Sequence, residues 1–142
     1  MWNVKPTLDV LNQLAPNTML EALGITFTEV GEDYLEATMP VDKRTKQPMG
    51  LLHGGASVAL AESLGSVAAY LSSPDPLNAT AVGVEINANH IKPARKGFVT
   101  GRVSPIKIGK TIQVWQIEIK DEEGNLICSS RLTTMTIQNK KE

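Results

Sequence analysis

The sequence predicts an α+β domain in which an antiparallel sheet of about six strands wraps around one long central helix. Residues 54 to about 71 are almost wholly apolar and long enough for about four to five helical turns. Segments before and after them are rich in β-branched residues and alternate apolar with polar positions, as strands do. A helix that is apolar on nearly every side must be covered on nearly every side. The 142 residues suit a single domain, 1–142, whose core needs no disulfide or structural metal.

Two short helices are expected near the N-terminus. Thr7 is a suitable N-cap for a helix with leucines at helical spacing, which ends before Pro16. A second helix can begin at Asn17 or Thr18 and stop at Gly24, because glycine readily adopts the left-handed conformation at a helix C-terminus. Neither helix shows a pattern of residues that indicates chemistry.

Strand patterns lie on both sides of the long helix. The segments ITFTEV and YLEATMPV alternate around the turn GED and predict a hairpin, and DKRTKQPMG after them is a loop. Four more strands are expected in TAVGVEINANH, GFVTGRVSPIKI, TIQVWQIEIKD and LICSSRLTTMTI, with DEEGN as the hairpin turn between the last two. Most of these strands are joined in sequence.

Composition and charge exclude several classes of protein. The net charge of -1 provides no general attraction to nucleic acid or anionic membranes, so neither is expected as a partner. No stretch approaches the roughly 18 uninterrupted apolar residues that span a bilayer, and MWNVKPTLDVLNQL lacks the apolar centre of a signal peptide. Cys128 is the only cysteine, which excludes an intrachain disulfide and favours a reducing, cytoplasmic location.

Glu62 is a lone carboxylate in the apolar helix. Burying an unpaired carboxylate is costly, so such a group has either a raised pKa or a specific partner. Glu62 can lie at a wet interface, pair with a lysine or arginine, or serve as a catalytic carboxylate. Ser66, four residues later, shares its helix face and can hydrogen-bond to the carboxylate or to a water molecule.

The glycines of the motif HGG lie where the long helix begins. Backbone N–H groups there lack helical partners, and the helix dipole favours negative charge. The N–H of Gly54 or Gly55 can therefore stabilise a developing oxyanion, and glycine allows a substrate carbonyl to come close. Alternatively, the glycines only form a tight turn into the helix. The presence of Glu62 on the same helix favours the chemical interpretation.

The distance between these two features implies a site built from two chains. Gly54 and Glu62 are separated by about 12 Å along the helix, because each residue adds about 1.5 Å. That is too far for both to act on one carbonyl from the same chain. If both act, two antiparallel helices related by a two-fold axis would bring the Gly54 end of one beside Glu62 of the other. The carboxylate would then face a cleft between subunits.

Other candidates have a chemical role and an ordinary structural alternative. Gln47 can donate through its amide to a carbonyl or sulfur, or it can simply be solvated in its loop. His53 can shape an oxyanion pocket, or it can bond to backbone groups at the turn. With His53 and His90 as the only histidines and one cysteine, a zinc site is not expected. Cys128 stands in a strand pattern without a base partner, so a buried thiol is expected rather than a nucleophile.

Basic residues gather at the expected strand ends, in HIKPARKG and IKIGKT, and one more lies in the last strand. Such a local cluster on a near-neutral protein suits a phosphorylated ligand, or it can be a solvated basic rim. No Walker loop or dinucleotide fingerprint is present. The residues concerned are His90, Lys92, Arg95, Lys96, Lys107, Lys110 and Arg131.

Three segments resemble a known family: VDKRTKQPMGLLHGGASVALAESLGSVA, GVEINANHIKPARKG and VWQIEIKDEEGNLICSSRLTT. They are similar to the hotdog-fold acyl-CoA thioesterases of the 4-hydroxybenzoyl-CoA thioesterase (Arthrobacter) type, over nearly the whole chain. Within that family, the similarity is greatest to the members of menaquinone synthesis that act on 1,4-dihydroxy-2-naphthoyl-CoA and to their enterobactin-pathway proofreading relatives. The resemblance implies a hotdog fold, homodimers with shared active sites that form a homotetramer, and hydrolysis of a CoA thioester without a metal or cofactor.

The resemblance also implies roles for individual residues. The family's catalytic carboxylate falls on Glu62, its carbonyl-polarising backbone amide on Gly54, and its assisting glutamine on Gln47. The helix hydroxyl is Ser66, and the histidine of the HGG motif is His53. The residues that would hold the acyl group and CoA are Gly83, His90, Ile91, Lys92, Pro93, Lys107, Ile108, Gly109, Lys110, Ser130 and Arg131.

The expected reaction is hydrolysis of an aromatic acyl-CoA with a hydroxybenzoyl- or dihydroxynaphthoyl-like group. Three departures from the family pattern bear on the acyl preference: Met49 replaces a common phenylalanine, Lys92 a frequent arginine, and the loop SSPDPLNAT is rich in proline. A broad-range or medium-chain thioesterase acting on acyl-CoA or acyl-carrier protein is the alternative. A hydratase or dehydratase would be expected to carry a helix histidine, and a non-catalytic acyl-CoA-binding protein would not need the complete catalytic set.

Overall fold

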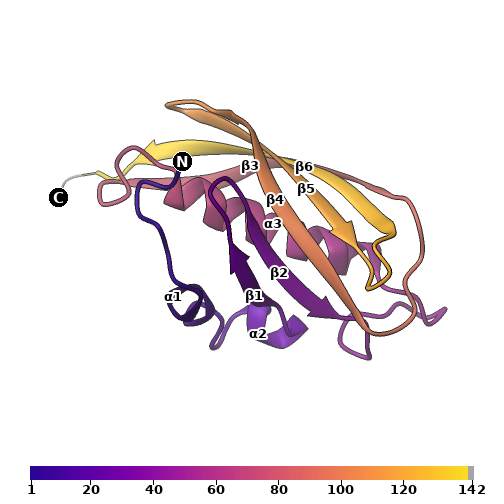
Figure 1. Cartoon of the computed structure of the whole chain (residues 1–142). Helices are drawn as coiled ribbons and strands as arrows, with labels where there is room; N and C mark the ends of the chain where they lie inside the picture. Colours follow the sequence, from indigo (N-terminus) through magenta and orange to yellow (C-terminus); the bar gives the residue numbers. More distant parts are fainter. Residues whose placement is uncertain (141–142) are drawn as a thin grey trace.

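The computed structural model describes residues 1–140 and shows a six-stranded antiparallel sheet curved around a long helix (Figure 1). This arrangement is the hotdog fold, and the expected fold class is confirmed. Among the described residues, no helix is long and apolar enough to cross a membrane. In chain order the elements are α1 (Leu8–Asn12), α2 (Met19–Leu23), β1 (Thr26–Val30), β2 (Leu35–Pro40), α3 (Gly54–Leu71), β3 (Ala79–His90), β4 (Phe98–Ile108), β5 (Ile112–Lys120) and β6 (Leu126–Gln138).

The two short helices have the caps that the sequence predicts. The hydroxyl of Thr7 accepts a hydrogen bond from the N–H of Val10 at 3.3 Å, and that of Thr18 accepts from the N–H of Leu20 at 3.2 Å. Gly24 ends α2 in the left-handed conformation, with φ 69°. Both helices are only five residues long, so they depend on tertiary packing rather than on helix propensity.

The sheet order is β1-β2-β4-β5-β6-β3, with every neighbouring pair antiparallel. The strands β4, β5 and β6 are neighbours in sequence and in space, as expected. The exception is β3, which lies beyond β6 at the far edge because α3 carries the chain across the inner face of the sheet after β2. No described strand pairs with the second edge of β3, which leaves a 12-residue row of backbone hydrogen-bonding groups open there.

The core lies between α3 and the inner face of the sheet. Leu60 and Leu64 on the helix, and Trp115 and Leu132 on the strands, are completely buried. Gly65 allows the close approach of helix and sheet, because a β-carbon at this position would collide with the side chain of Leu132. The absence of a side chain at Gly65 therefore sets how closely α3 lies against β6.

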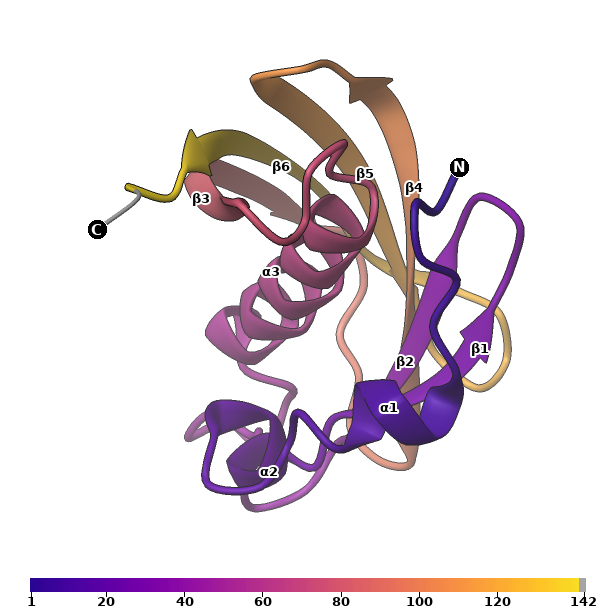
Figure 2. The same ribbon diagram turned by 90° about the vertical axis from the view of Figure 1, so that its left-hand side faces the viewer.

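A single chain covers only one side of α3, which corrects the expectation that the sheet encloses the helix on nearly every side. Figure 2 shows the sheet curving along one side of the helix and leaving the other side open. The sheet is six strands wide, and its edge strand β3 reaches α3 without passing around it. The open face consists of half-buried or exposed residues: Val58, Ala59, Glu62, Ser63, Ser66, Val67 and Tyr70.

Replacing Leu132 with alanine should lower the free energy of unfolding by about 2–5 kcal/mol, because it removes a buried side chain and leaves a cavity beside Gly65. Urea denaturation at a fixed protein concentration measures this change. Ile137→Ala on the same strand is the control, since Ile137 is 45% exposed; its cost should stay below about 1 kcal/mol. Equal losses for the two variants would contradict the packing described for α3 and β6.

Candidate active site

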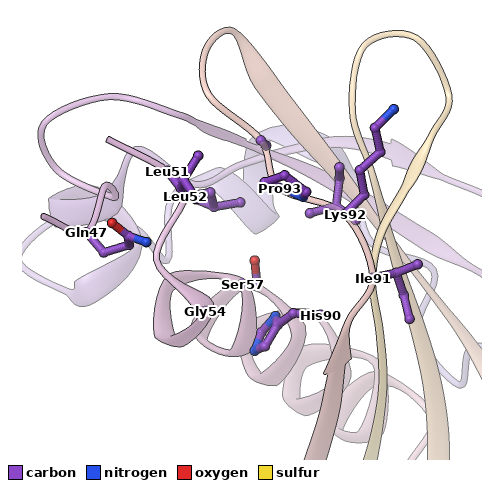
Figure 3. A pocket seen from close by; sticks show the side chains of 11 residues that line it. Gln47, Leu51, Leu52, Gly54, Ser57, His90, Ile91, Lys92 and Pro93 are labelled. Atoms are coloured by element: carbon purple, nitrogen blue, oxygen red, sulfur yellow. The ribbon is translucent and has the colours of Figure 1, made fainter. Parts of the chain in front are cut away.

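A pocket of about 290 Å³ opens at the N-terminal end of α3 (Figure 3). Its walls come from four segments: the loop before α3, the first turn of α3, the end of β3 with the chain that follows it, and the start of β6. Backbone hydrogen bonds fix these walls, since the N–H of Leu52 donates to the carbonyl of Ala94 at 2.8 Å and that of Ile91 to the carbonyl of Ile127 at 2.7 Å. The pocket is thus built into the fold. Its polar members are Gln47, Gly54, Ser57, His90 and Lys92.

Gly54 presents a free backbone donor at this pocket. It is the first residue of α3, and among the described residues its N–H makes no hydrogen bond. The N–H also lies at the positive end of the dipole of an 18-residue helix. A β-carbon on Gly54 would lie 2.7 Å from Nε2 of His90. The absence of a side chain at Gly54 therefore lets the imidazole lie close to the helix terminus that carries the donor.

His53 is the N-cap of α3. Its Nδ1 accepts a hydrogen bond from the N–H of Gly55 at 2.8 Å, so the ring carries its proton on Nε2 when it is neutral. The side chain is exposed and lines a separate hollow with Arg44 and Lys46, outside the pocket of Gly54. Within one chain, His53 thus holds the turn from which the Gly54 N–H projects, which is the structural alternative considered from the sequence.

Gln47 contributes a second donor to the pocket. Its Oε1 accepts a hydrogen bond from the N–H of Met49, which assigns the other amide atom as Nε2. Figure 3 shows that nitrogen on the side of Gln47 that faces α3. The loop is held by hydrogen bonds from the N–H of Gln47 to the carbonyl of Leu51 at 2.8 Å and from the N–H of Gly50 to the carbonyl of Gln47 at 2.9 Å. The amide is therefore oriented to donate into the pocket.

Glu62 lies outside this pocket, on the open face of α3. The described residues give it no ion pair, and burial alone raises the pKa of its carboxyl above the ordinary value. Among the described residues, the alternative of a lysine or arginine partner therefore finds no support. Ser66 follows one turn later on the same half-buried face. The carboxylate and the Gly54 donor belong to different surfaces of one chain.

Gly83 makes room for the carboxylate of Glu62. A β-carbon at Gly83 would collide with Oε1 of Glu62. The pairing of β3 with β6 shifts register between Gly83 and Glu85, which is a bulge of the kind that re-aims side chains beside functional sites. The sequence suggested Gly83 as a contact for the ligand, whereas within one chain its contact is with the helix carboxylate.

The residues expected to hold the acyl group and CoA lie in two separate places in one chain. The segment from His90 to Pro93 lines the pocket. The segment from Lys107 to Lys110 forms the hairpin between β4 and β5, at the opposite end of the sheet (Figure 1). Ser130 faces inward and donates to the carbonyl of Asn87 at 2.8 Å, and Arg131 is exposed on the outer face. A single chain does not assemble this set around one ligand.

Cys128 is buried, and burial raises the pKa of its thiol, so it has the inert character expected from the sequence.

Ser57 lines the pocket beside Gly54, and the sequence analysis gave it no role. Its position three residues after Gly54 places both residues on one helix face. The described residues contain no group of three histidine, cysteine or acidic side chains that could hold a metal ion.

Comparison with known proteins identifies the family. The thioesterase superfamily model matches residues 49–128, which include the HGG motif, Glu62 and Gly83. The chain belongs to the thioesterase superfamily. It is an enzyme that hydrolyses acyl-CoA thioesters, so the expected family and reaction class are confirmed, and the hydratase and non-catalytic alternatives find no support.

This thioesterase has close relatives of known or assigned activity. It is 58% identical over 134 residues to the 1,4-dihydroxy-2-naphthoyl-CoA hydrolase of Escherichia coli (strain K12), covering 94% of this chain and 97% of the relative. It is 51% identical to the proofreading thioesterase EntH of Cronobacter sakazakii, covering 94% and 96%. A crystal structure of a thioesterase from Haemophilus influenzae superposes with a TM-score of 0.92 at 52% identity, covering 99% of this chain and 97% of that one.

Glu62→Gln should stabilise the protein at neutral pH. The folded state raises the pKa of Glu62 by burial, so the ionised carboxylate is penalised in the folded protein relative to the unfolded chain. This penalty is present above the raised pKa and disappears as the pH falls below the ordinary value of 4.5. Thermal unfolding between pH 4 and 8 should therefore show a higher Tm for the variant at pH 7 and a difference that shrinks toward pH 4. A lower Tm at pH 7 would mean that the carboxylate has a stabilising partner.

Proposed function

We propose that this thioesterase hydrolyses an aromatic acyl-CoA, with a hydroxybenzoyl- or dihydroxynaphthoyl-like acyl group, to the free acid and CoA. The substrate named for the Escherichia coli relative supports an aromatic bicyclic acyl group of the kind used in menaquinone synthesis. The reaction requires no metal or cofactor, since CoA is part of the substrate. A cytoplasmic location, inferred from the sequence, remains a prediction.

The proposed chemistry divides between two groups. The Gly54 N–H polarises the thioester carbonyl, helped by the Gln47 amide, and stabilises the oxyanion that forms when the carbonyl is attacked. The ionised carboxylate of Glu62 either attacks that carbon or activates a water molecule to do so. Burial of Glu62 supports either role, because a carboxylate removed from bulk water is a stronger base and a better nucleophile.

The separation of these groups within one chain is the observation that carries the proposal. Gln47 and Gly54 line the pocket, whereas Glu62 lies on the open face of α3 and outside that pocket. A second copy of the chain would supply the missing carboxylate. The unpaired edge of β3 supports this arrangement, because two such edges can pair antiparallel about a two-fold axis and continue the sheet. Two of these dimers would form the expected homotetramer.

The same pairing would bring the separated ligand-binding residues together. In an antiparallel pair, the His90 end of one β3 lies beside the Ala79 end of the other. The hairpin from Lys107 to Lys110 is near the Ala79 end, because Ile112, Met135 and Val82 are successive partners across the sheet. The basic hairpin of one subunit would therefore approach the pocket of its partner and contact the CoA phosphates there.

A broad-range acyl-CoA thioesterase is the second candidate. The apolar part of the pocket lining is aliphatic, with Leu51, Leu52, Ile91 and Ile127 but no aromatic side chain. Met49, in the loop between the lining residues Gln47 and Leu51, is 78% exposed, and methionine adapts to different ligand shapes. Such a lining accepts medium-length acyl chains as well as rings. Comparing kcat/KM for benzoyl-, naphthoyl- and medium-chain acyl-CoA decides between the two, since a clear aromatic preference excludes the broad-range enzyme.

Glu62→Ala should lower kcat by about a hundredfold or more with every active substrate, because it removes the base or nucleophile. In the wild-type enzyme, kcat/KM should fall as the pH drops through the pKa of Glu62, which burial places above the ordinary 4.5. Thiol release measures both effects. Glu118→Gln, an exposed carboxylate of β5, is the matched control and should leave kcat unchanged. A Glu62→Ala enzyme with more than a tenth of the wild-type kcat would exclude this role.

Mixing two inactive variants tests the shared site. Glu62→Ala removes the carboxylate but keeps Gly54, whereas Gly54→Val blocks the oxyanion end of its own chain but keeps Glu62. In a mixed dimer, one of the two sites combines an intact Gly54 with an intact Glu62. Random pairing makes about half of the dimers mixed, so activity should recover to roughly a quarter of the wild-type value. If mass spectrometry shows that subunits exchange and no activity returns, each site belongs to one chain.

A further inference from the structure

Ser57 is a polar residue in a position that the chain leaves unsatisfied. The residue is only 1% exposed, yet it lines the pocket at the N-terminal end of α3. Figure 3 shows its hydroxyl directed away from the helix into the space between Leu52 and Pro93. Its oxygen is not one of the fully buried unpartnered atoms of the described chain, so it is accessible from the pocket, where water or a ligand can bond to it.

Two other serines have hydroxyls that are bonded within the chain. The hydroxyl of Ser63, on the same helix, donates to the carbonyl of Ala59 four residues earlier at 2.7 Å, and that of Ser130 donates to the carbonyl of Asn87. The hydroxyl of Ser57 makes no hydrogen bond with any described residue. The carbonyl four residues before it, on His53, already accepts from the N–H of Ser57 at 3.3 Å. The Ser57 hydroxyl is thus free for a ligand in the pocket.

Helix geometry directs this hydroxyl toward the Gly54 donor. Residues three apart lie on the same helix face, separated by about 4.5 Å along the axis. The Cα–Cβ bond tilts toward the helix N-terminus, so the side chain of Ser57 covers the turn that begins at Gly54. The Gly54 N–H and the Ser57 O–H therefore enter one pocket from neighbouring positions. A carbonyl oxygen, with two lone pairs, can accept from both.

We propose that the Ser57 hydroxyl is a second donor to the thioester carbonyl oxygen, beside the backbone N–H of Gly54. The inference rests on the proposed function, in which that carbonyl lies at the N-terminus of α3. The hydroxyl keeps its proton throughout and only donates a hydrogen bond. When the carbonyl carbon is attacked, the oxygen becomes negatively charged, and the hydrogen bond from Ser57 strengthens. Ser57 thus favours the transition state more than the bound substrate.

Kinetics with three variants tests this role. Ser57→Ala should lower kcat by about a hundredfold and leave KM within about a factor of two, because the interaction strengthens in the transition state. Ser57→Thr keeps a hydroxyl and should recover at least a tenth of the wild-type kcat. Ser63→Ala is the control, since that hydroxyl already bonds within the helix, and it should match the wild type.

Three kinetic outcomes would overturn the inference. A raised KM at unchanged kcat would mean that Ser57 contacts a part of the ligand that does not react. Wild-type kinetics for Ser57→Ala would mean that the hydroxyl only holds water. Equal losses for Ser57→Ala and Ser57→Thr, with the Tm of both unchanged, would mean that the pocket requires a shape rather than a hydroxyl.

The infrared band of the bound carbonyl provides a readout that is independent of turnover. Benzoyl-CoA labelled with ¹³C at the carbonyl is bound to Glu62→Ala and to Glu62→Ala/Ser57→Ala. Loss of a donor should move the band of the double variant toward its frequency in solution, and identical bands would refute a contact between Ser57 and the carbonyl. If Glu62→Ala retains more than a tenth of the wild-type kcat, the assignment of Glu62 fails. The Ser57→Ala and Ser57→Thr kinetics in the wild-type background then decide the inference separately.

Discussion

The packing of α3 along the inner face of the sheet is the interaction on which the rest of this structure depends. Gly65 lets the helix lie directly against Leu132, and the leucines of the buried face hold it there. Once this contact fixes the helix, its N-terminus lies beside the end of β3, which places Gly54 next to His90. The same contact places Glu62 over Gly83. Both halves of the proposed chemistry are therefore positioned by one helix.

This arrangement places costly polar groups where the stability of the fold does not require them. Glu62 is desolvated without an ion-pair partner, Gly54 has an unbonded N–H, and the Ser57 hydroxyl has no partner in the described chain. Burial of the Glu62 carboxylate without a partner destabilises the folded state, whereas Gly54 and Ser57 line the open pocket. The well-packed core beneath α3 offsets this cost. Preorganised donors and a desolvated base stabilise a charged transition state more strongly than bulk water does.

The unsatisfied features of one chain complement one another. The pocket has oxyanion donors but no carboxylate, the open face of α3 carries the carboxylate, and β3 has an edge that no described strand pairs with. Two-fold pairing of the β3 edges would complete the sheet edge and bring the carboxylate of one chain to the pocket of the other. It would do so because antiparallel pairing places opposite ends of the two chains side by side. The split between His90–Pro93 at one end of the sheet and the Lys107–Lys110 hairpin at the other fits the same explanation.

The sequence by itself determined the elements and the principal candidates. The caps at Thr7 and Thr18, the long helix and the strands were predictable, because caps, turns and periodicity are local properties. Glu62 was also evident, since a carboxylate in an apolar helix stands out without any structure. Only the tertiary structure decided that β3 lies at the far edge, that Gly83 receives the carboxylate and that Ser57 faces the pocket. These depend on which distant segments pack together, and residue spacing along the chain does not specify that.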